Sequence, residues 1–401
     1  MLSRNIKTPL FLAASFSAIA CLIYTSSLVS SGARIANLCV YSAEKLVIQE
    51  MNEEKEDSEA PDPLIPPPAL TIPKRIAWFR GKLPDLDVLK SNDSGQKFHG
   101  RALEFFDKNC TDQFFMIWFS PARKFGPREF LAVESLMKAN PQACLMILSR
   151  TLDSRRGHKI LKPLLDRGLK IVAVTPDVPF LVKNTPAEAW LKELKSGKKD
   201  PGKIPLYNNL SNLIRLAILY RYGGVYLDTD FIVLRNFTGL RNAVGVQVID
   251  PKTEKWSSVN GALMIFDIAH PILVEFLSEF ATTFDGNMWG HNGPYMLSRV
   301  IKRLDVGDAN TTPYNITILP IKAFYPVDWF QMPKLYKKPT TEQESKRAEE
   351  TVDELNRDSY ALHLWNQVTR ELVIEEGSVM QRIIASHCLI CGDTYNSSIA
   401  I

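Results

Sequence analysis

The fold is decided by the stretch Asn209–Leu234, which reads NLSNLIRLAILYRYGGVYLDTDFIVL. Apolar residues recur in its first half at the i, i+3, i+4, i+7 spacing of a buried helix face. Gly223 and Gly224 then favour a helix end, since glycine readily adopts the left-handed conformation that closes one. We therefore expect a helix, a short strand that ends at Asp228–Asp230, and a second strand directly after it.

Upstream of this stretch, short apolar runs alternate with helical patterns. Strands are predicted at Phe114–Phe119, Cys144–Leu148 and Leu169–Val174, and helices at Arg128–Lys138 and Lys159–Leu165. This alternation predicts an α/β fold with a parallel sheet covered on both faces, in which ligands bind beyond the carboxyl ends of the strands. The sequence has no Walker loop and no GxGxxG motif, which argues against an ATPase or a dinucleotide-dependent dehydrogenase.

Asp228 and Asp230 are the candidate catalytic residues. Two aspartates at positions i and i+2 of a strand end can meet one hard cation, because Mg²⁺ and Mn²⁺ prefer carboxylate, water and phosphate oxygens. A cation held this way also binds the diphosphate of a nucleotide sugar and stabilises the leaving nucleoside diphosphate. An isolated Asp-X-Asp is common in solvated loops, so the prediction depends on the helix, glycine pair and apolar strand before it.

Three polar residues, Ser211, Asn212 and Arg215, lie within about one helical turn of each other before the aspartates. We expect Arg215 to contact the donor, because arginine suits phosphates and sugar hydroxyls. The alternative is that Arg215 is the buried ion-pair partner of an aspartate.

The order helix, Gly-Gly, Tyr-X-Asp-X-Asp in Ser211–Leu234 resembles the signature of the DXD-containing α-1,4-glycosyltransferases, the globotriaosylceramide-synthase-like type of glycosyltransferase family 32. The resemblance extends from about Phe114 to the C-terminus and includes Arg128–Pro141 and Ala361–Asn366. It implies a GT-A-like (Rossmann-like) luminal domain, a nucleotide-sugar donor, Mn²⁺ (or Mg²⁺) and retention of the anomeric configuration. It also implies a single-pass type II protein of the Golgi membrane.

On this resemblance, the expected donor contacts are Ser211, Asn212, Arg215, Tyr226 and Asp228. Members of the family often have Ser-Asp where this chain has Ser211 and Asn212. Asparagine keeps hydrogen bonding to sugar hydroxyls but loses a charge, so the donor preference of other members does not transfer directly.

Two further segments supply candidate acceptor-side contacts. Asn260 and Gly261 are expected to follow a strand and loop, and the glycine would allow a sugar to approach the backbone; the alternative is a tight turn into a core strand. His291 and Asn292 lie in a Gly-rich loop before a new helix, where the alternative role for Asn292 is a helix N-cap.

His363 lies in a short apolar run that is expected to be a strand. A lone histidine in such a run is usually a core residue. The resemblance instead implies the third metal ligand beside Asp228 and Asp230, and a neutral imidazole suits Mn²⁺ better than Mg²⁺. His387 is expected to be structural.

The N-terminal segment is expected to anchor the chain in a membrane. Residues 10–30 are mostly apolar and follow a short basic tail (1–9), which predicts one transmembrane signal anchor with the remainder in the lumen. A cleaved signal peptide is the alternative. Residues 31–73 become acidic and then Pro-rich, which predicts an extended stem, and residues 74–401 are the predicted luminal glycosyltransferase domain. The net charge of +4 gives no reason to expect a nucleic-acid partner.

Cysteines and sequons are consistent with a luminal domain. Cys110, Cys144, Cys388 and Cys391 allow three disulfide pairings, and the last two also have the spacing of half a zinc site or a redox pair. The Asn-X-Ser/Thr sequons are Asn92, Asn109, Asn209, Asn236, Asn310, Asn315 and Asn396. Asn209 lies in the expected helix, so we expect it to be unglycosylated.

The residue patterns and the family resemblance together imply a Mn²⁺-dependent glycosyltransferase. It would move a hexose from a nucleotide sugar to a glycolipid or glycan acceptor, in an α linkage with retention. Transfer of N-acetylglucosamine or mannose rather than galactose stays open. The rival hypotheses are a catalytically inactive Golgi scaffold related to the family, which the intact aspartate pair argues against, and a secreted lectin.

Overall fold

The computed structural model describes residues 64–90, 94–306 and 314–390. The predicted cytosolic tail, the membrane anchor and residues 31–63 of the stem lie outside these ranges, as does Cys391. Among the helices of the described ranges, none combines the length and apolar character that a bilayer crossing requires.

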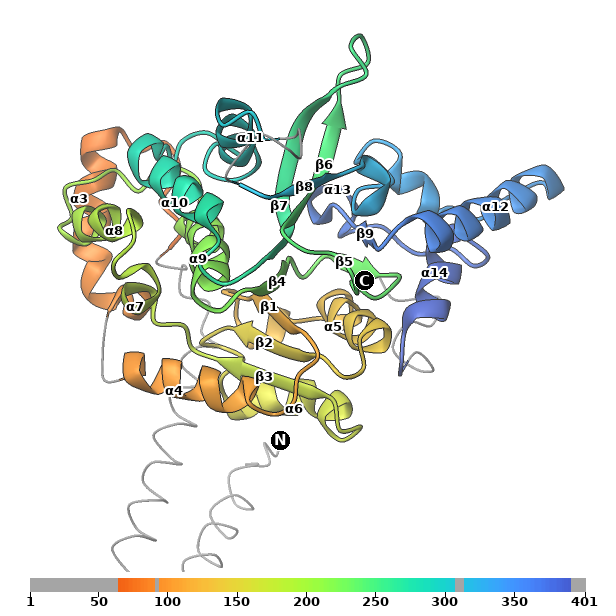
Figure 1. Ribbon diagram of the computed structural model, residues 1–401, viewed down its shortest axis with the longest axis horizontal. Coiled ribbons are helices and arrows are strands. Elements are labelled where there is room, and N and C mark those ends of the chain that lie inside the picture. Colours follow the sequence, from red (N-terminus) through yellow and green to blue (C-terminus); the bar gives the residue numbers. More distant parts are fainter. Residues whose placement is uncertain (1–63, 91–93, 307–313, 391–401) are drawn as a thin grey trace, which may run out of the picture. The chain divides into compact units, whose positions relative to one another are not determined.

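A seven-stranded mixed sheet organises the domain (Figure 1). Its strand order is β3-β2-β1-β4-β7-β6-β8, and β5 pairs with β9 in a separate two-stranded sheet. Strands β1 to β4 are parallel, β7 is antiparallel to both β4 and β6, and β8 is parallel to β6. The strands are β1 (Gln113–Ile117), β2 (Cys144–Leu148), β3 (Lys170–Val174), β4 (Gly224–Leu227), β5 (Phe231–Val233), β6 (Ala243–Ile249), β7 (Trp256–Phe266), β8 (Thr317–Leu319) and β9 (Ala361–His363).

Helices cover both faces of the sheet. The helices are α3 (Ile72–Lys82), α4 (Ser94–Phe106), α5 (Pro127–Ala139), α6 (Arg155–Leu165), α7 (Val178–Val182), α8 (Ala187–Lys195), α9 (Leu206–Tyr222), α10 (Pro271–Thr283), α11 (Pro294–Arg303), α12 (Glu342–Asp358), α13 (Asn366–Thr369) and α14 (Val379–His387). Side chains of α9, α10 and α11 pack on one face, and those of α5 and α6 pack on the other.

The apolar run that begins β1 shows why a buried parallel strand was predictable. Phe115 and Ile117 face the core beneath α9, whereas Phe114 and Met116 face the core beneath α5. Because successive side chains of a strand point to opposite faces, a strand with helices on both sides must be apolar at every position. The predicted α/β class is confirmed, and the sheet is parallel from β1 to β4 but becomes mixed where β7 joins it.

A third core joins the C-terminal segment to the rest of the domain. It combines Leu131 of α5 and Ile232 of β5 with apolar residues of α12 and α14 and with Leu362 of β9. β5 and β9 pair in antiparallel register, with Phe231 opposite His363. This pairing places the C-terminal segment beside Asp228 and Asp230, which follow β4.

The end of the predicted stem already contacts the domain. The carbonyl oxygen of Leu64 accepts a hydrogen bond from the amide of Leu206, 2.8 Å away, and Pro66 is buried. Of the three open cysteine pairings, the structure contains the disulfide Cys110–Cys144, and Cys388 is also disulfide-bonded.

Candidate active site

The turn from α9 into β4 places the aspartates. Gly223 closes α9 at a φ of 65°, and its amide donates to the carbonyl of Leu219. Gly224 has a φ of 99°, and a Cβ there would lie 2.4 Å from the carbonyl oxygen of Gln113 in the neighbouring strand. Only glycine fits this position, because both its φ and its contact with β1 exclude a side chain. The predicted helix, glycine stop and short strand are confirmed.

Asp228 follows β4 and is held by Arg215 and Tyr226. The Nη2 of Arg215 lies 3.0 Å from Oδ1 of Asp228, and the hydroxyl of Tyr226 donates to the same oxygen at 2.5 Å. The guanidinium of Arg215 also stacks 4.6 Å above the ring of the buried Tyr226. Burial raises the pKa of Asp228 above its ordinary value; Arg215 opposes this rise and the charge of Asp230 adds to it.

Arg215 is itself tied to protein atoms on several sides. Its Nη1 donates to the carbonyl of Gly261 at 2.8 Å, and its Nη2 donates to the Ser211 hydroxyl at 3.1 Å. The structure therefore contains the ion pair that the sequence left open as an alternative. A direct contact between Arg215 and a donor stays a prediction.

Asp230 is held from the other side, by the C-terminal segment. Its Oδ1 lies 3.4 Å from Nε2 of His363, and its Oδ2 accepts from the amide of Asn366 at 3.2 Å. Its backbone carbonyl accepts from the amide of Leu364 at 2.8 Å. Burial alone would raise the pKa of Asp230, but His363 and the Asn366 amide outweigh it and lower the pKa to about 2.

Arg128 of α5 supports this C-terminal contact, and the sequence analysis gave it no role. Its Nη1 donates to Oδ1 of Asn366 at 3.0 Å and to the hydroxyl of Thr369 at 2.8 Å, and its Nη2 donates to the carbonyl of Thr369. Arg128 is only 3% exposed. The family resemblance includes both Arg128–Pro141 and Ala361–Asn366. The contact between Arg128 and Asn366 is visible only in the structure.

Asn260 and Gly261 lie at a register shift between β6 and β7, and their contact with an acceptor stays a prediction. The two residues lie inside β7, which begins at Trp256 after β6 and the turn at residues 250–255, so a strand and a loop precede them as expected. The pairing of β6 with β7 passes from Val244 opposite Met264 to Gly245 opposite Asn260, so the residues between bulge out of the ladder. The bulge presents the carbonyl of Gly261 to Arg215.

Gly261 in the bulge and its neighbour Asn260 have different surroundings. A Cβ on Gly261 would meet Leu297 of α11 at 3.2 Å, so the absence of a side chain makes room for that helix. Asn260 is partly exposed, and its Oδ1 accepts from the amide of Ala262.

The loop between α10 and α11 reaches the same region. Asn292 is 2% exposed, and its Nδ2 donates to Oδ1 of Asn209 and to the carbonyl of Asp285. It therefore ties the loop to α9, while the N-cap of α11 is Gly293 rather than Asn292. A Cβ on Gly293 would lie 3.1 Å from Oδ1 of Asn212, so the loop lies directly against the predicted donor residue.

His291 and Asn212 differ in how their polar atoms are used. The Nε2 of His291 lies 2.8 Å from the carbonyl oxygen of Thr283. The side-chain amide of the partly exposed Asn212 has no hydrogen-bond partner among the described residues. Asn212 is thus the predicted donor residue whose side chain is most available to a ligand.

The aspartates fit a divalent cation as a donor set, although the described residues contain no group of three His, Cys, Asp or Glu side chains already close enough to hold one. The 3.4 Å between Asp230 Oδ1 and His363 Nε2 is near the separation of about 3 Å between neighbouring ligands of a cation held at 2.0–2.1 Å. The amide of Trp365 points at Nδ1 of His363 from 3.3 Å, which favours a proton on Nε2. The two aspartates are therefore the better supported ligands.

Two family models match this chain in adjoining regions. Residues 126–250 match a "glycosyltransferase sugar-binding region containing DXD motif", and residues 265–395 match an "alpha 1,4-glycosyltransferase conserved region". The first includes both aspartates and Arg215, and the second includes His363 and Asn366. Both halves of the site are thus covered by the two models.

Three relatives illustrate the similarity. Lactosylceramide 4-alpha-galactosyltransferase of Mus musculus is 31% identical over 64% of this chain and 68% of its own length. Alpha-1,4-N-acetylglucosaminyltransferase of Homo sapiens is 27% identical over 53% of this chain and 58% of its own length. An uncharacterised protein of Arabidopsis thaliana is 32% identical over 72% of this chain, which spans 44% of that protein's length. The chain therefore belongs to the DXD-containing α-1,4-glycosyltransferase family and is by that membership a hexosyltransferase.

Proposed function

We propose that the protein transfers a hexose from a nucleotide sugar to a hydroxyl of a glycolipid or glycan, forming an α linkage with retention of configuration. The observation that carries the proposal is the pair of carboxylates just past the carboxyl end of β4. Asp228 is held by Arg215 and Tyr226, and Asp230 is held by His363 and the Asn366 amide. Ligands of open α/β sheets bind at this end of the strands, as in the GT-A-like arrangement that we propose.

The cation that suits this site is Mn²⁺, with Mg²⁺ as the alternative. Asp228 and Asp230 would hold it, and His363 would join them if its proton moved to Nδ1. When bound, the cation supplies positive charge to the diphosphate that leaves with the nucleoside. The low pKa of Asp230 keeps that carboxylate ionised at every physiological pH.

The protein groups around the pair have separate tasks in this proposal. Arg215 and Tyr226 fix the direction of Asp228, because both bind the same carboxylate oxygen. Asn212 offers its free amide to the donor sugar. Because Asp228 and Asp230 are assigned to the cation, the leaving phosphate is the base that we propose for a same-face attack by the acceptor hydroxyl.

The acceptor would approach past Asn260 and the loop that carries His291. Relatives named for lactosylceramide and for N-acetylglucosamine support a glycosphingolipid or glycan acceptor and leave the donor open between UDP-galactose and UDP-N-acetylglucosamine. We further propose a single-pass type II location in the Golgi membrane, with this domain in the lumen. The apolar residues 10–30 and the basic tail before them support that placement.

A donor screen tests the function. The full-length chain, purified in detergent, is incubated with Mn²⁺ and each of UDP-galactose, UDP-N-acetylglucosamine and GDP-mannose, with and without a lactose-terminated glycolipid. We expect one donor to release nucleoside diphosphate in a chelator-sensitive reaction, and the acceptor to gain one α-linked hexose. Release from none of the donors, or equal release by an Asp228→Asn/Asp230→Asn double variant, would contradict the proposal.

A further inference from the structure

Two surface hollows lie away from the aspartates. The aspartates follow the carboxyl end of β4, and the hollows lie near the other end of that strand. One, the β8 hollow, measures about 510 Å³ and is lined by residues that include Arg241, Asp267, His270 and Asn315. Asp267 follows Phe266, which pairs with Gly224 at the start of β4, whereas the aspartates follow the far end of that strand. The β8 hollow therefore has no part in the donor site.

The second, the β9 hollow, measures about 450 Å³ and is lined by Ala139, Leu234, Arg235, Asn236, Thr238 and Tyr360. It lies where β5 ends, and β5 begins directly after Asp230. The segment between β5 and β6 therefore lines both hollows. Leu234, Arg235, Asn236 and Thr238 line the β9 hollow, and residues 239–243 line the β8 hollow.

Each hollow contains a complete sequon. Asn315 and Thr317 line the β8 hollow, and Asn236 and Thr238 line the β9 hollow. Both asparagines are exposed, and the Nδ2 atoms of both have no hydrogen-bond partner among the described residues. Glycosylation joins a sugar to this nitrogen, so both are chemically available.

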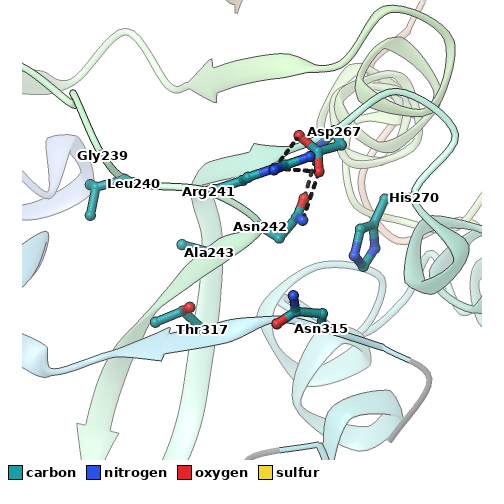
Figure 2. A pocket seen from close by; sticks show the side chains of 9 residues that line it. All are labelled: Gly239, Leu240, Arg241, Asn242, Ala243, Asp267, His270, Asn315 and Thr317. Atoms are coloured by element: carbon teal, nitrogen blue, oxygen red, sulfur yellow. Dashed lines mark hydrogen bonds and ion pairs between the residues drawn. The ribbon is translucent and has the colours of Figure 1, made fainter. Parts of the chain in front are cut away.

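The β8 hollow is built from polar groups that suit a sugar. Figure 2 shows the side chains of Asn242, His270 and Asn315 around the same opening. Asp267 is bound by Arg241 at 2.8 Å and by Nδ2 of Asn242 at 2.8 Å. His270 is 7% exposed, yet its Nδ1 has no hydrogen-bond partner within the part of the chain that the structure describes, which is costly for a buried polar atom. A ligand hydroxyl or amide would satisfy it.

The β9 hollow is lined by the aromatic ring of Tyr360, whereas the β8 hollow is lined by His270. The guanidinium of Arg235 stacks 4.4 Å above the ring of Tyr360, and its Nε donates to the carbonyl of Ser359. The amide of Thr238 donates to Oδ1 of Asn236, which leaves the Nδ2 of that side chain turned to its other side. Flat aromatic and guanidinium surfaces with polar edges suit the mixed apolar and polar faces of a sugar ring.

We propose that Asn236 and Asn315 carry N-linked glycans and that the first N-acetylglucosamine of each lies in the adjoining hollow. The donor is an oligosaccharide joined to a polyisoprenyl diphosphate. The bond from the asparagine Nδ2 to C1 of the sugar forms as the bond from C1 to the diphosphate oxygen breaks, the lipid diphosphate leaves, and Nδ2 loses one proton. The inference depends on the luminal placement within the proposed function.

The glycan at Asn315 would have a structural effect beyond filling the hollow. β8 begins two residues later and is the last strand of the seven-stranded sheet. An edge strand exposes unpaired backbone groups to other chains, and a bulky hydrophilic glycan beside it hinders such pairing.

Two other sequons serve as matched controls. Asn209 is 4% exposed within α9 and its Oδ1 accepts from Asn292, so the fold has no room for a glycan there. Asn109 is exposed but lines neither hollow. A glycan at Asn109 would therefore be attached without a docked first sugar.

The test uses the full-length chain from cells that retain high-mannose N-glycans. Peptide mass spectrometry reads the occupancy of each sequon, and we expect glycans at Asn236 and Asn315 and none at Asn209. Endoglycosidase H applied to one sample leaves one N-acetylglucosamine per site, and peptide N-glycosidase F applied to a second, untreated sample removes the whole glycan and leaves aspartate. We expect the endoglycosidase-trimmed protein to melt at least about 2 °C above the fully deglycosylated protein.

Site variants show where that difference in melting temperature arises. It should shrink in Asn236→Gln and in Asn315→Gln and stay unchanged in Asn109→Gln. The inference would be overturned if Asn236 and Asn315 carried no glycan. It would also be overturned if the difference in melting temperature stayed the same in Asn236→Gln and Asn315→Gln. Transferase activity, measured on the same samples, reports separately on the proposed function.

Discussion

Asp228 and Asp230 are two residues apart, yet two different regions of the molecule hold them. Asp228 is bound by Arg215 and Tyr226, which belong to the same helix–strand unit. Asp230 is bound by the C-terminal segment, and its partner Asn366 lies 136 positions along the chain. The site therefore lies where these two regions meet, and a substitution in one region can disturb one aspartate without disturbing the other.

The two regions also have opposite effects on ionisation. Burial raises the pKa of Asp228, although the Arg215 charge opposes this, whereas His363 and a backbone amide outweigh burial and lower the pKa of Asp230 to about 2. Asp230 is therefore ionised at every physiological pH. The ionisation of Asp228 is instead favoured by the charge of Arg215 and disfavoured by burial. Four substitutions test this difference between the two regions.

The largest effect is expected when Asp230 itself is changed. Asp230→Asn removes the permanent charge but keeps the size, and we expect kcat to fall at least about 100-fold. The melting temperature should fall only modestly, because asparagine keeps the size of the side chain and can still accept the hydrogen bond of the Asn366 amide. A fully active Asp230→Asn variant would show that the anion has no role in transfer.

Removal of Arg128 should loosen the C-terminal region. Arg128→Ala leaves Asn366 and Thr369 without their buried partner, and we expect the free energy of unfolding to fall by about 3 kcal/mol. Activity should fall as well, because the Asn366 amide would no longer be fixed against Asp230.

A matched control separates this effect from the general loss of a charge. Arg357→Ala breaks only an exposed pair with Asp358 on α12, and its effect should stay within about 0.5 kcal/mol. Denaturant titration of both variants makes the comparison, and equal losses would argue against a supporting role for Arg128.

Removal of Arg215 should act on the other region. Arg215→Ala leaves the carboxylate of Asp228 without its ion pair and the Gly261 carbonyl without its donor, at a cost of about 2 kcal/mol. The KM for the donor should rise, while Arg215→Lys should recover only part of the loss because lysine cannot bind both groups at once. Steady-state kinetics of the two variants decides this, and a complete recovery by lysine would show that charge alone matters.

The smallest effect concerns pH and the C-terminal region. Burial first, and then the charge of Lys138, lower the pKa of His387 to about 4 from an ordinary 6.5. The folded state thus disfavours the protonated ring, so its stabilisation is complete above pH 6.5 and is lost as the pH falls towards 4. Allowing for solvent screening, we expect this loss to be about 1–2 kcal/mol. His387→Gln should flatten the stability profile in this range, and an unchanged slope would contradict the assignment.

The sequence predicts well what is local in the chain. The helix, glycine stop and strand of Asn209–Leu234 appear as expected, because periodicity and glycine chemistry act over a few residues. The alternation that marked a parallel sheet is equally local. The same window contained Arg215 and Asp228, but whether they face each other or a ligand depends on side-chain packing.

What the sequence could not predict depends on distant partners. The bulge at Gly261 arises from the register of β6 against β7, which no local pattern encodes. Arg128 looks like an ordinary residue of a helix until Thr369 is brought beside it. Asn292 was expected in a sugar-binding loop or at a helix N-cap; it lies in the loop, the N-cap is Gly293, and no local pattern indicates that Asn292 is buried against Asn209 of α9.

The central claim is that the two aspartates act as one site for the donor diphosphate. Calorimetric titration of nucleoside diphosphate in the presence of Mn²⁺ measures it directly, on the wild type, Asp228→Asn, Asp230→Asn and the double variant. If both side chains hold one cation, each single variant should lose most of the Mn²⁺-dependent affinity, and the double variant should be little weaker than either. Losses that simply add in the double variant, or a single variant that binds like the wild type, would contradict the claim.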